Sequence, residues 1–448
     1  GPPNDNRSVD DSKKPAPAAE EGANPANPDE PPSAHPPKPT TTTTTTPREW
    51  TTEDANTATG DNLNNISDES SESDEAAAAQ PLPDAKAEAL AAELARTIIN
   101  ARRGALFVTG AGISCASGIA AFRTGDDAVW SKHVTAMGTK KAFKREPLEW
   151  FNSFWLPTFE SSRVRTAKPS PAHKALARIA SRLPRTVRVV TQNVDGLHCA
   201  RLHGPREGVA DPQLVEAHGR YGLFRCAGCD ATGAVRRDGC DDETAKNDWY
   251  ELDELDADDA RRIAAACGMG PAAAGTTTTI SQPRLQAPPR CPKCKVCVAM
   301  PLALLFDEIY DAHFFFEADA WDAWLDEADV IVFVGTSFAV ELTREALRRS
   351  RQRSPQHGGV PVYDVNVQLA PPTIVRSEYL RNHTLLGDCQ RILPRLAYLV
   401  DQRLTTSSAA AEATSSASEH QVAASSAGTH VSGPPEPSCS ASSSSSSS

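Results

Sequence analysis

The sequence has no long apolar runs. No stretch of its 448 residues reaches the roughly 20 apolar residues of a membrane-spanning helix, and none near the start resembles a signal peptide. We therefore expect no membrane partner. Both ends also lack regularly spaced apolar residues: residues 1–80 are acidic and rich in Pro and Thr, and residues 404–448 are mostly Ser and Ala. Such segments cannot offset their ordering entropy, so we predict disordered tails around a folded domain at 81–403.

The net charge of −12 is unevenly distributed. Residues 1–80 carry 5 basic and 16 acidic residues, and residues 238–259 carry 1 basic and 11 acidic residues. The remaining folded region is basic, which suits an anionic ligand, whereas the acidic segments suit basic protein tails. We expect no direct sequence-specific binding of nucleic acid.

Cysteine is concentrated in one pattern. Four of the 11 cysteines form two C-x-x-C pairs, Cys226 with Cys229 and Cys291 with Cys294. In an intracellular protein, two such pairs predict a closed tetrahedral zinc site rather than disulfides. The pairs are separated by 61 residues, which we interpret as an acidic insertion at 230–290 within a zinc module at about 219–300. Other cysteines remain possible substitutes as ligands: Cys240, Cys267 and Cys297, the last of which forms a further C-x-x-C with Cys294.

Four short apolar runs predict buried parallel strands, at 105–108, 187–190, 330–334 and 360–365. Helical patterns lie between them, including one that Asp84 caps and one at 171–181. This alternation predicts a doubly wound α/β sheet. Glycine or polar residues follow each strand, and open sheets of this kind bind ligands at these carboxyl ends. The residues concerned are Gly110, Ala111 and Gly112, the segment 191–196, Gly335, Thr336 and Ser337, and Asn366.

These stretches together resemble the motifs of the sirtuins, the NAD-dependent protein deacylases. The matching segments occur in the family's order within about 84–400: GAGIS followed by GI-x-x-FR, TQNVDGLH, EAHG, the two C-x-x-C pairs, GTS, and the Asn of VYDVNV. The resemblance implies a Rossmann-like domain with a smaller zinc-binding and helical domain, and NAD bound between them.

The resemblance also assigns cofactor contacts. In the family, the residue matching Asp195 binds the nicotinamide carboxamide, and the residue matching Asn193 orients the ribose and a water. The full set expected to bind NAD is Gly110, Ala111, Gly112, Ser114, Phe122, Arg123, Gln192, Asn193, Asp195, Gly335, Thr336, Ser337, Asn366 and Cys389.

His218 matches the family's general base. There the acyl-lysine carbonyl oxygen attacks C1′ of the NAD ribose as nicotinamide leaves, and the histidine then deprotonates a ribose hydroxyl. The products are free lysine and O-acyl-ADP-ribose. An imidazole that titrates near neutral pH suits this task.

The acyl-binding wall is predicted from the segment MPLALLFDE. It resembles the family's substrate strand, with Leu304, Leu305 and Phe306 as the apolar wall. Asp307 stands where the family has Gly, and either alters peptide approach or points to solvent.

Aromatic residues crowd the region 126–157, where they first of all predict a small hydrophobic core. The region resembles the branch that includes desuccinylases, whose Tyr and Arg bind the acyl carboxylate. Phe154 and Pro157 occupy those positions here, so negatively charged acyl groups are predicted to be poor substrates. Ala120 and Ala121 depart from the Pro-Asp of many sirtuins, which favours slower turnover.

The sequence therefore predicts an NAD-dependent protein lysine deacetylase that acts on histones or other proteins in the nucleus or cytoplasm. Two alternatives stay open. One is mono-ADP-ribosyl transfer to protein, with the same NAD cleavage and another nucleophile. The other is a non-catalytic, NAD-binding scaffold for chromatin or other partners, against which His218, Asn193 and Asp195 argue.

Overall fold

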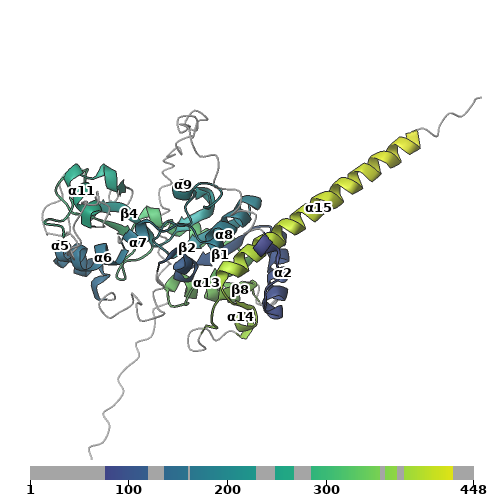
Figure 1. Ribbon diagram of the computed structural model, residues 1–448, viewed down its shortest axis with the longest axis horizontal. Coiled ribbons are helices and arrows are strands. Elements are labelled where there is room, and N and C mark those ends of the chain that lie inside the picture. The colour runs from purple at the N-terminus through teal and green to yellow at the C-terminus, as the bar shows by residue number, and fades with distance from the viewer. Residues whose placement is uncertain are drawn as a thin grey trace, which may run out of the picture. The chain divides into compact units, whose positions relative to one another are not determined.

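The structure is a computed structural model that describes residues 76–119, 136–159, 162–228, 248–266, 284–353, 359–370 and 378–426 (Figure 1). Several predicted features lie outside these ranges: Ala120, Ala121, Phe122, Arg123, Cys229, Cys240, Cys267, residues 1–75 of the N-terminal tail and residues 427–448 of the C-terminal tail. None of the helices in the described ranges combines the length and the apolar character needed to cross a bilayer.

A six-stranded parallel sheet forms the larger part of the fold, in the order β3-β2-β1-β7-β8-β9. β1 and β7 are buried along their whole length, which explains why they appear in the sequence as continuous apolar runs. The predicted doubly wound sheet is confirmed. Its strands are β1 (Ala105–Thr109), β2 (Val187–Thr191), β3 (Leu214–Glu216), β7 (Val330–Val334), β8 (Val362–Asn366) and β9 (Thr384–Leu386).

Helices cover both faces of this sheet (Figure 1). α2 (Ala85–Asn100), α8 (Pro171–Arg182) and α15 (Cys389–Ser426) pack on one face, together with Phe107 of β1. α12 (Ala318–Glu327), α13 (Glu341–Gln352) and α14 (Glu378–Asn382) pack on the other, together with Leu106. Asp84 caps α2 as predicted, because its carboxylate accepts the backbone N–H of Ala87 at 2.7 Å. The short helix α9 (Ala200–His203) follows β2.

α15 corrects the predicted start of the C-terminal tail. The helix continues past residue 403 to Ser426, where we expected disorder from 404. The segment 404–426 is rich in Ala, the best helix former, and holds neither Gly nor Pro, so the helix can propagate. Residues 427–448 lie outside the described ranges.

A smaller domain is built around a three-stranded antiparallel sheet in the order β5-β4-β6. Its strands are β4 (Gly219–Cys226), β5 (Tyr250–Glu251) and β6 (Ala299–Ala303). Helical segments complete it: α4 (Lys140–Arg145), α5 (Pro147–Trp150), the π-helical turn η2 (Phe151–Trp155), α6 (Leu156–Phe159), α7 (Ser162–Arg165), the 3₁₀ turn η5 (Leu252–Glu254) and α11 (Ala257–Ala266). This is the predicted zinc-binding and helical domain.

Aromatic rings fill the core of the small domain, as the sequence predicted. Phe143 packs edge-on against Trp150 at 5.1 Å between ring centroids, and Trp150 stacks on Trp155 at 5.6 Å. Phe154 and Trp155 lie in the π-helical turn η2, and Pro157 follows it without a backbone N–H to continue the regular bonding. Such turns are frequent at functional sites.

Part of the predicted insertion belongs to this core. β5 pairs with β4, and Leu255, Ile263 and Leu285 are buried among the aromatic residues. The segment 230–290 is therefore not wholly peripheral to the zinc module. Burial of these side chains explains why apolar residues recur within an otherwise acidic stretch.

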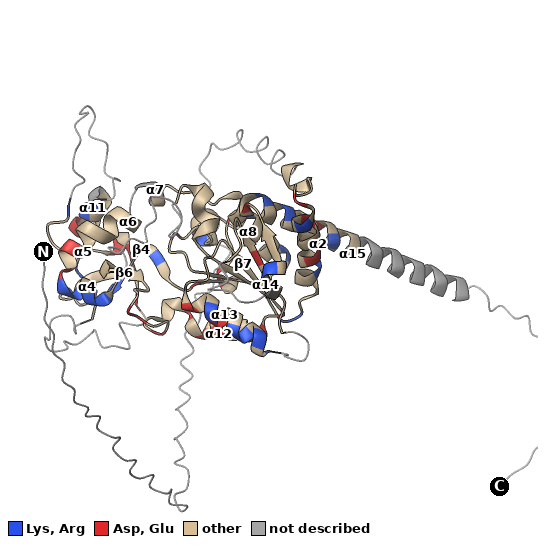
Figure 2. Cartoon of the chain, turned by 90° about the horizontal axis from the view of Figure 1, so that it is seen from below, with Lys and Arg blue, Asp and Glu red and all other residues tan. Residues whose placement is uncertain are grey.

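Charge is segregated by element (Figure 2). Basic residues are concentrated on α4, whose sequence is KKAFKR. On α12 and α13 the two signs are interleaved, and Arg349 pairs with Asp322 and Asp326. Within these surface pairs the opposite charges offset each other. The residues of α4 itself are basic or apolar, so this helix presents a basic surface.

Two glycine turns meet at the centre of the sheet. Gly110 and Gly112 lie at the end of β1, where the 3₁₀ turn η1 (Ala111–Ser117) begins, and Gly335 follows β7. The Gly112 N–H donates to the Gly335 carbonyl at 2.9 Å. A Cβ added to Gly335 would lie 2.7 Å from the Gly112 Cα, and the φ of Gly335 is +59°. The backbones are thus too close for any side chain.

We expect Gly335→Ala to lower the free energy of unfolding by about 3 kcal/mol, because it adds overpacking to a left-handed backbone. Gly118→Ala is the matched control, since Gly118 also has a positive φ, of +82°, but no atom within 4 Å of an added Cβ. It should cost only about 1 kcal/mol. Urea unfolding of both variants measures the difference. Equal losses of stability would show that the close backbone contact at Gly335 has no effect of its own.

Candidate functional site

A cleft of about 860 Å³ opens at the carboxyl ends of the central strands. Most of the predicted site residues line it, from both the large and the small domain. They are Gly110, Ala111, Gly112, Gln192, Asn193, His218, Leu304, Leu305, Phe306, Gly335, Thr336, Ser337, Asn366 and Cys389. The structure thus brings together residues from distant parts of the chain.

Asn193 is held rigidly behind the first glycine turn. Its side-chain N–H₂ donates to the Gly110 carbonyl and to the Ser114 hydroxyl, both at 3.1 Å. Ser114 in turn donates its hydroxyl to the Asp195 carboxylate at 2.6 Å. Each of these buried polar side chains therefore has a hydrogen-bond partner.

Asp195 and Ser114 are buried beside the cleft rather than among its lining residues. Burial raises the pKa of Asp195, while the Ser114 hydroxyl and the Leu197 N–H act in the opposite direction. Both hydrogen bonds favour the carboxylate and so offset part of the effect of burial.

Asn366 and Gln192 tie the remaining strand ends together. Asn366 donates from its amide to the Thr336 carbonyl at 2.9 Å. Gln192 donates to the Thr109 carbonyl at 3.2 Å. The ends of β1, β2, β7 and β8 therefore form one hydrogen-bonded floor.

His218 faces the cleft in a fixed orientation. Its Nδ1 lies 2.8 Å from the Gln192 carbonyl and its Nε2 lies 3.2 Å from the Tyr310 hydroxyl. Burial lowers the pKa of His218 to about 4, against the effect of the Gln192 carbonyl. The sequence predicted an imidazole that titrates near neutral pH; the enclosed site instead disfavours the charged form, so the ring is neutral at pH 7.

The predicted acyl wall shares the cleft with aromatic residues, of which only Phe154 was assigned to the acyl site from the sequence. Leu304 and Leu305 line one side, and Phe306, about half exposed, stands at the rim. Phe154, Trp155 and Phe159 also line the cleft. Arg344 is the one Lys or Arg among the described residues of the lining, and it pairs with Glu341.

Asp307 does more than point to solvent. Its carboxylate accepts the backbone N–H groups of Lys140 and Lys141, at 2.5 and 3.0 Å, and so caps α4. Phe306 also donates its N–H to the Gly138 carbonyl at 2.9 Å. The end of the substrate-strand segment is thereby tied to the start of α4.

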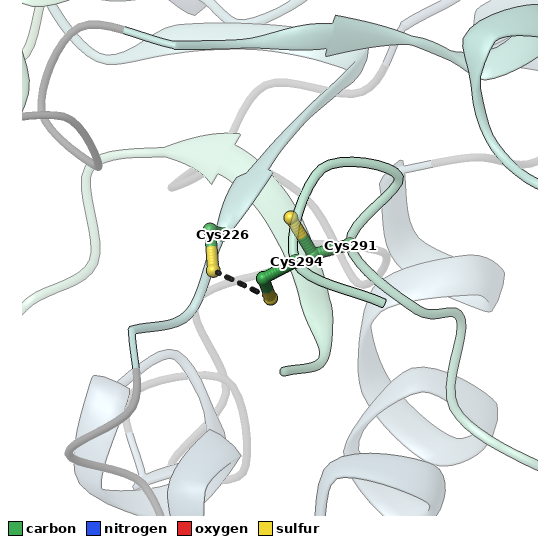
Figure 3. Close-up of side chains that lie close together, drawn as sticks. All are labelled: Cys226, Cys291 and Cys294. Atoms are coloured by element: carbon green, nitrogen blue, oxygen red, sulfur yellow. Dashed lines mark hydrogen bonds between the residues drawn. The ribbon is translucent and has the colours of Figure 1, made fainter. Parts of the chain in front are cut away.

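Three of the four predicted zinc ligands meet at the far side of the small domain. The Sγ atoms of Cys226, Cys291 and Cys294 lie within 4.8 Å of one another, and the pair Cys226–Cys294 is 4.0 Å apart (Figure 3). A tetrahedral site with Zn–S bonds of about 2.3 Å needs sulfur atoms about 3.8 Å apart, so these residues fit zinc. A hydrogen bond with Cys226 lowers the pKa of the Cys291 thiol, which favours the thiolate form.

The fourth ligand stays a prediction. Cys229 lies outside the described residues, and Cys297 is not part of the cluster of three sulfur atoms. The Cys297 backbone N–H instead donates to the Cys294 sulfur at 3.3 Å, the kind of contact that orients a metal-bound thiolate.

Some cleft residues carried no readable signal in the sequence. Tyr310 lies beyond the last residue of the substrate-strand pattern, Trp155 was assigned only to a core, and Phe159 lies beyond the aromatic region at 126–157. Periodicity identifies buried positions but does not tell which of them border a cavity.

Comparison with known proteins gives consistent matches. The sequence profile of the Sir2 family matches residues 110–342. An NAD-dependent deacetylase, sir2E of Dictyostelium discoideum, is 35% identical over 57% of this chain, which spans 64% of that protein. NAD-dependent protein deacylase 1 of Pseudomonas aeruginosa is 31% identical over 67% of this chain and 94% of that protein. A solved Sir2 homologue–NAD complex is 23% identical with a TM-score of 0.46, covering 70% of this chain and 94% of that one.

We expect the purified protein to hold about one zinc ion per chain. Cys226→Ser and Cys291→Ser should abolish binding and destabilise the small domain, because a structural site contributes directly to folding. Cys115→Ser, which changes an exposed cysteine of the cleft, is the control and should keep the metal. Elemental analysis of Cys229→Ser and Cys297→Ser identifies the fourth ligand; metal-free wild-type protein would contradict the site.

Proposed function

The chain belongs to the Sir2 family, and from this premise we propose that it is an NAD-dependent protein lysine deacylase that removes acetyl groups. The observation that carries the proposal is the convergence of Asn193 and His218 on one cleft whose floor is two side-chain-free glycine turns. Relatives named as deacetylases and deacylases support the same activity.

The cleft fits NAD at its glycine-rich end. Gly110, Gly112 and Gly335 line the cleft without side chains, which lets a pyrophosphate approach the backbone closely. Asn193 and Gln192 present amides nearby, suited to ribose hydroxyls. NAD supplies the electrophilic ribose carbon and is consumed with the acyl-lysine.

The residues of this chain supply orientation and one base. The Nδ1–H of His218 is committed to the Gln192 carbonyl, so the lone pair resides on Nε2. A neutral imidazole can accept the proton of a ribose hydroxyl. Leu304, Leu305 and the aromatic residues of η2 and α6 exclude water around the acyl group.

We further propose a class of substrate and a location in the cell. Histones are proposed substrates, supported by the acidic segment 238–259, whose described part exposes Glu251, Asp253, Glu254, Asp256 and Asp258. These carboxylates would attract the basic residues around an acetylated lysine. A nuclear location accompanies this proposal.

An acetylated histone-tail peptide incubated with NAD should lose its acetyl group and yield nicotinamide. His218→Ala should lower the rate about 10²- to 10⁴-fold, because general-base catalysis is lost. His383→Ala, a histidine outside the cleft lining, should keep the wild-type rate. Mass spectrometry follows both products. Transfer of ADP-ribose to a protein, with the acetyl group retained, would replace this proposal with the transferase alternative.

Succinyl-lysine should be a poor substrate, with kcat/KM about 100-fold or more below that for acetyl-lysine. Phe154 lines the cleft and Pro157 is exposed outside it, so neither can pair with a carboxylate. An unpaired charge in an aromatic site costs at least about 3 kcal/mol.

Pentanoyl-lysine is the matched control for succinyl-lysine, because it has similar length without the charge. Its removal at a measurable rate would assign the discrimination to charge rather than to size. Equal rates of removal for succinyl and pentanoyl groups would contradict the predicted discrimination against charge.

A further inference from the structure

Tyr310 contacts the one atom of His218 that performs the proposed chemistry. The Gln192 carbonyl can only accept a hydrogen bond, so Nδ1 of His218 carries the proton and Nε2 carries the lone pair. The Tyr310 hydroxyl lies 3.2 Å from this Nε2. A lone pair cannot donate, so the tyrosine hydroxyl donates to it.

Tyr310 is itself held in place by the large domain. Its ring meets Trp321 of α12 edge-on at 5.7 Å between centroids and lies 5.8 Å from the imidazole at an angle of 29°. Its half-buried ring packs against the hydrophobic core under α12 and α13. These contacts hold the tyrosine ring beside the imidazole.

We propose that Tyr310 is a positioning residue for His218, fixing the imidazole with the Nε2 lone pair directed into the cleft. The proposal rests on the deacylase function above. The ribose hydroxyl would take the place at Nε2 that the tyrosine hydroxyl occupies in the free protein. The imidazole then meets substrate already oriented and in the correct tautomer.

The hydrogen bond from Tyr310 should shift the pKa of His218 in a predictable direction. Donation to Nε2 stabilises the neutral imidazole, so removing the hydroxyl should raise the pKa of His218. Among the described residues, the other titratable side chains that line the cleft are Cys115, Glu308, Glu341, Arg344, Asp388 and Cys389. Burial and the Gln192 carbonyl are the causes that shift the pKa of His218, and none of these six groups is among them.

Tyr310→Phe tests the proposal, because it removes only the hydroxyl. We expect kcat for deacetylation to fall about fivefold, the effect of one lost hydrogen bond, with KM for NAD unchanged. Exchange of labelled nicotinamide into NAD should continue, since that step precedes the action of His218. A variant that loses exchange and deacetylation in equal proportion would instead indicate general damage and overturn the assignment.

Tyr363→Phe is the matched control. It removes another tyrosine hydroxyl, which contacts Glu93 at 2.7 Å, and Tyr363 does not line the cleft. This variant should keep the wild-type ratio of deacetylation to nicotinamide exchange. A ratio altered equally in both variants would overturn the role of Tyr310.

An NMR titration of the His218 ring tests the contact independently of activity. The pKa of His218 should rise by about half a unit or more in Tyr310→Phe and stay unchanged in Tyr363→Phe. If wild-type protein does not act on acetyl-lysine but the pKa rises, the proposed function fails while the contact stands. Full activity and an unchanged pKa in Tyr310→Phe would overturn the positioning role alone.

Discussion

The backbone contact between the turns that follow β1 and β7 is the constraint on which the site depends. Gly112 and Gly335 meet without side chains, and a hydrogen bond joins them. This contact brings the first and second halves of the large domain within reach of one ligand. Asn193 and Asn366 then bond to the same two turns, so the positions of both amides follow from the contact.

Burial shifts the pKa values of two groups at the cleft in opposite directions. It lowers the pKa of His218 and raises that of Asp195, because a poorly solvated site disfavours either charge. The two groups differ in how they are compensated. Asp195 receives two hydrogen bonds that favour its ionised form, whereas His218 donates from Nδ1 to the Gln192 carbonyl, accepts at Nε2 from Tyr310 and remains neutral.

The sequence predicted the parts of the site that local chemistry dictates. A run of buried residues followed by glycine predicts a strand and a tight turn, so β1, β7 and their turns could be identified. The capping of α4 by Asp307 could not, because the two lie more than 160 residues apart and no local pattern links them. The role of Tyr310 could not be predicted for the same reason: its partner, His218, is 92 residues away. Helix α15 runs past residue 403, the predicted end of the folded domain, because low complexity was interpreted as disorder, although the Ala content favours helix.

The long interval between the cysteine pairs costs less loop-closure entropy than its length suggests. Closing a loop of 61 residues rather than about 18 adds only about 1 kcal/mol of entropy, because the cost grows with the logarithm of length. The described part of the interval offsets this cost. Leu255, Ile263 and Leu285 are buried in the aromatic core, and burial of one such side chain contributes about 1.5–3 kcal/mol. The antiparallel pairing of β4 with β6 then brings Cys226 beside Cys291 and Cys294. An insertion that adds its own apolar residues to the core can therefore be accommodated without loss of the metal site.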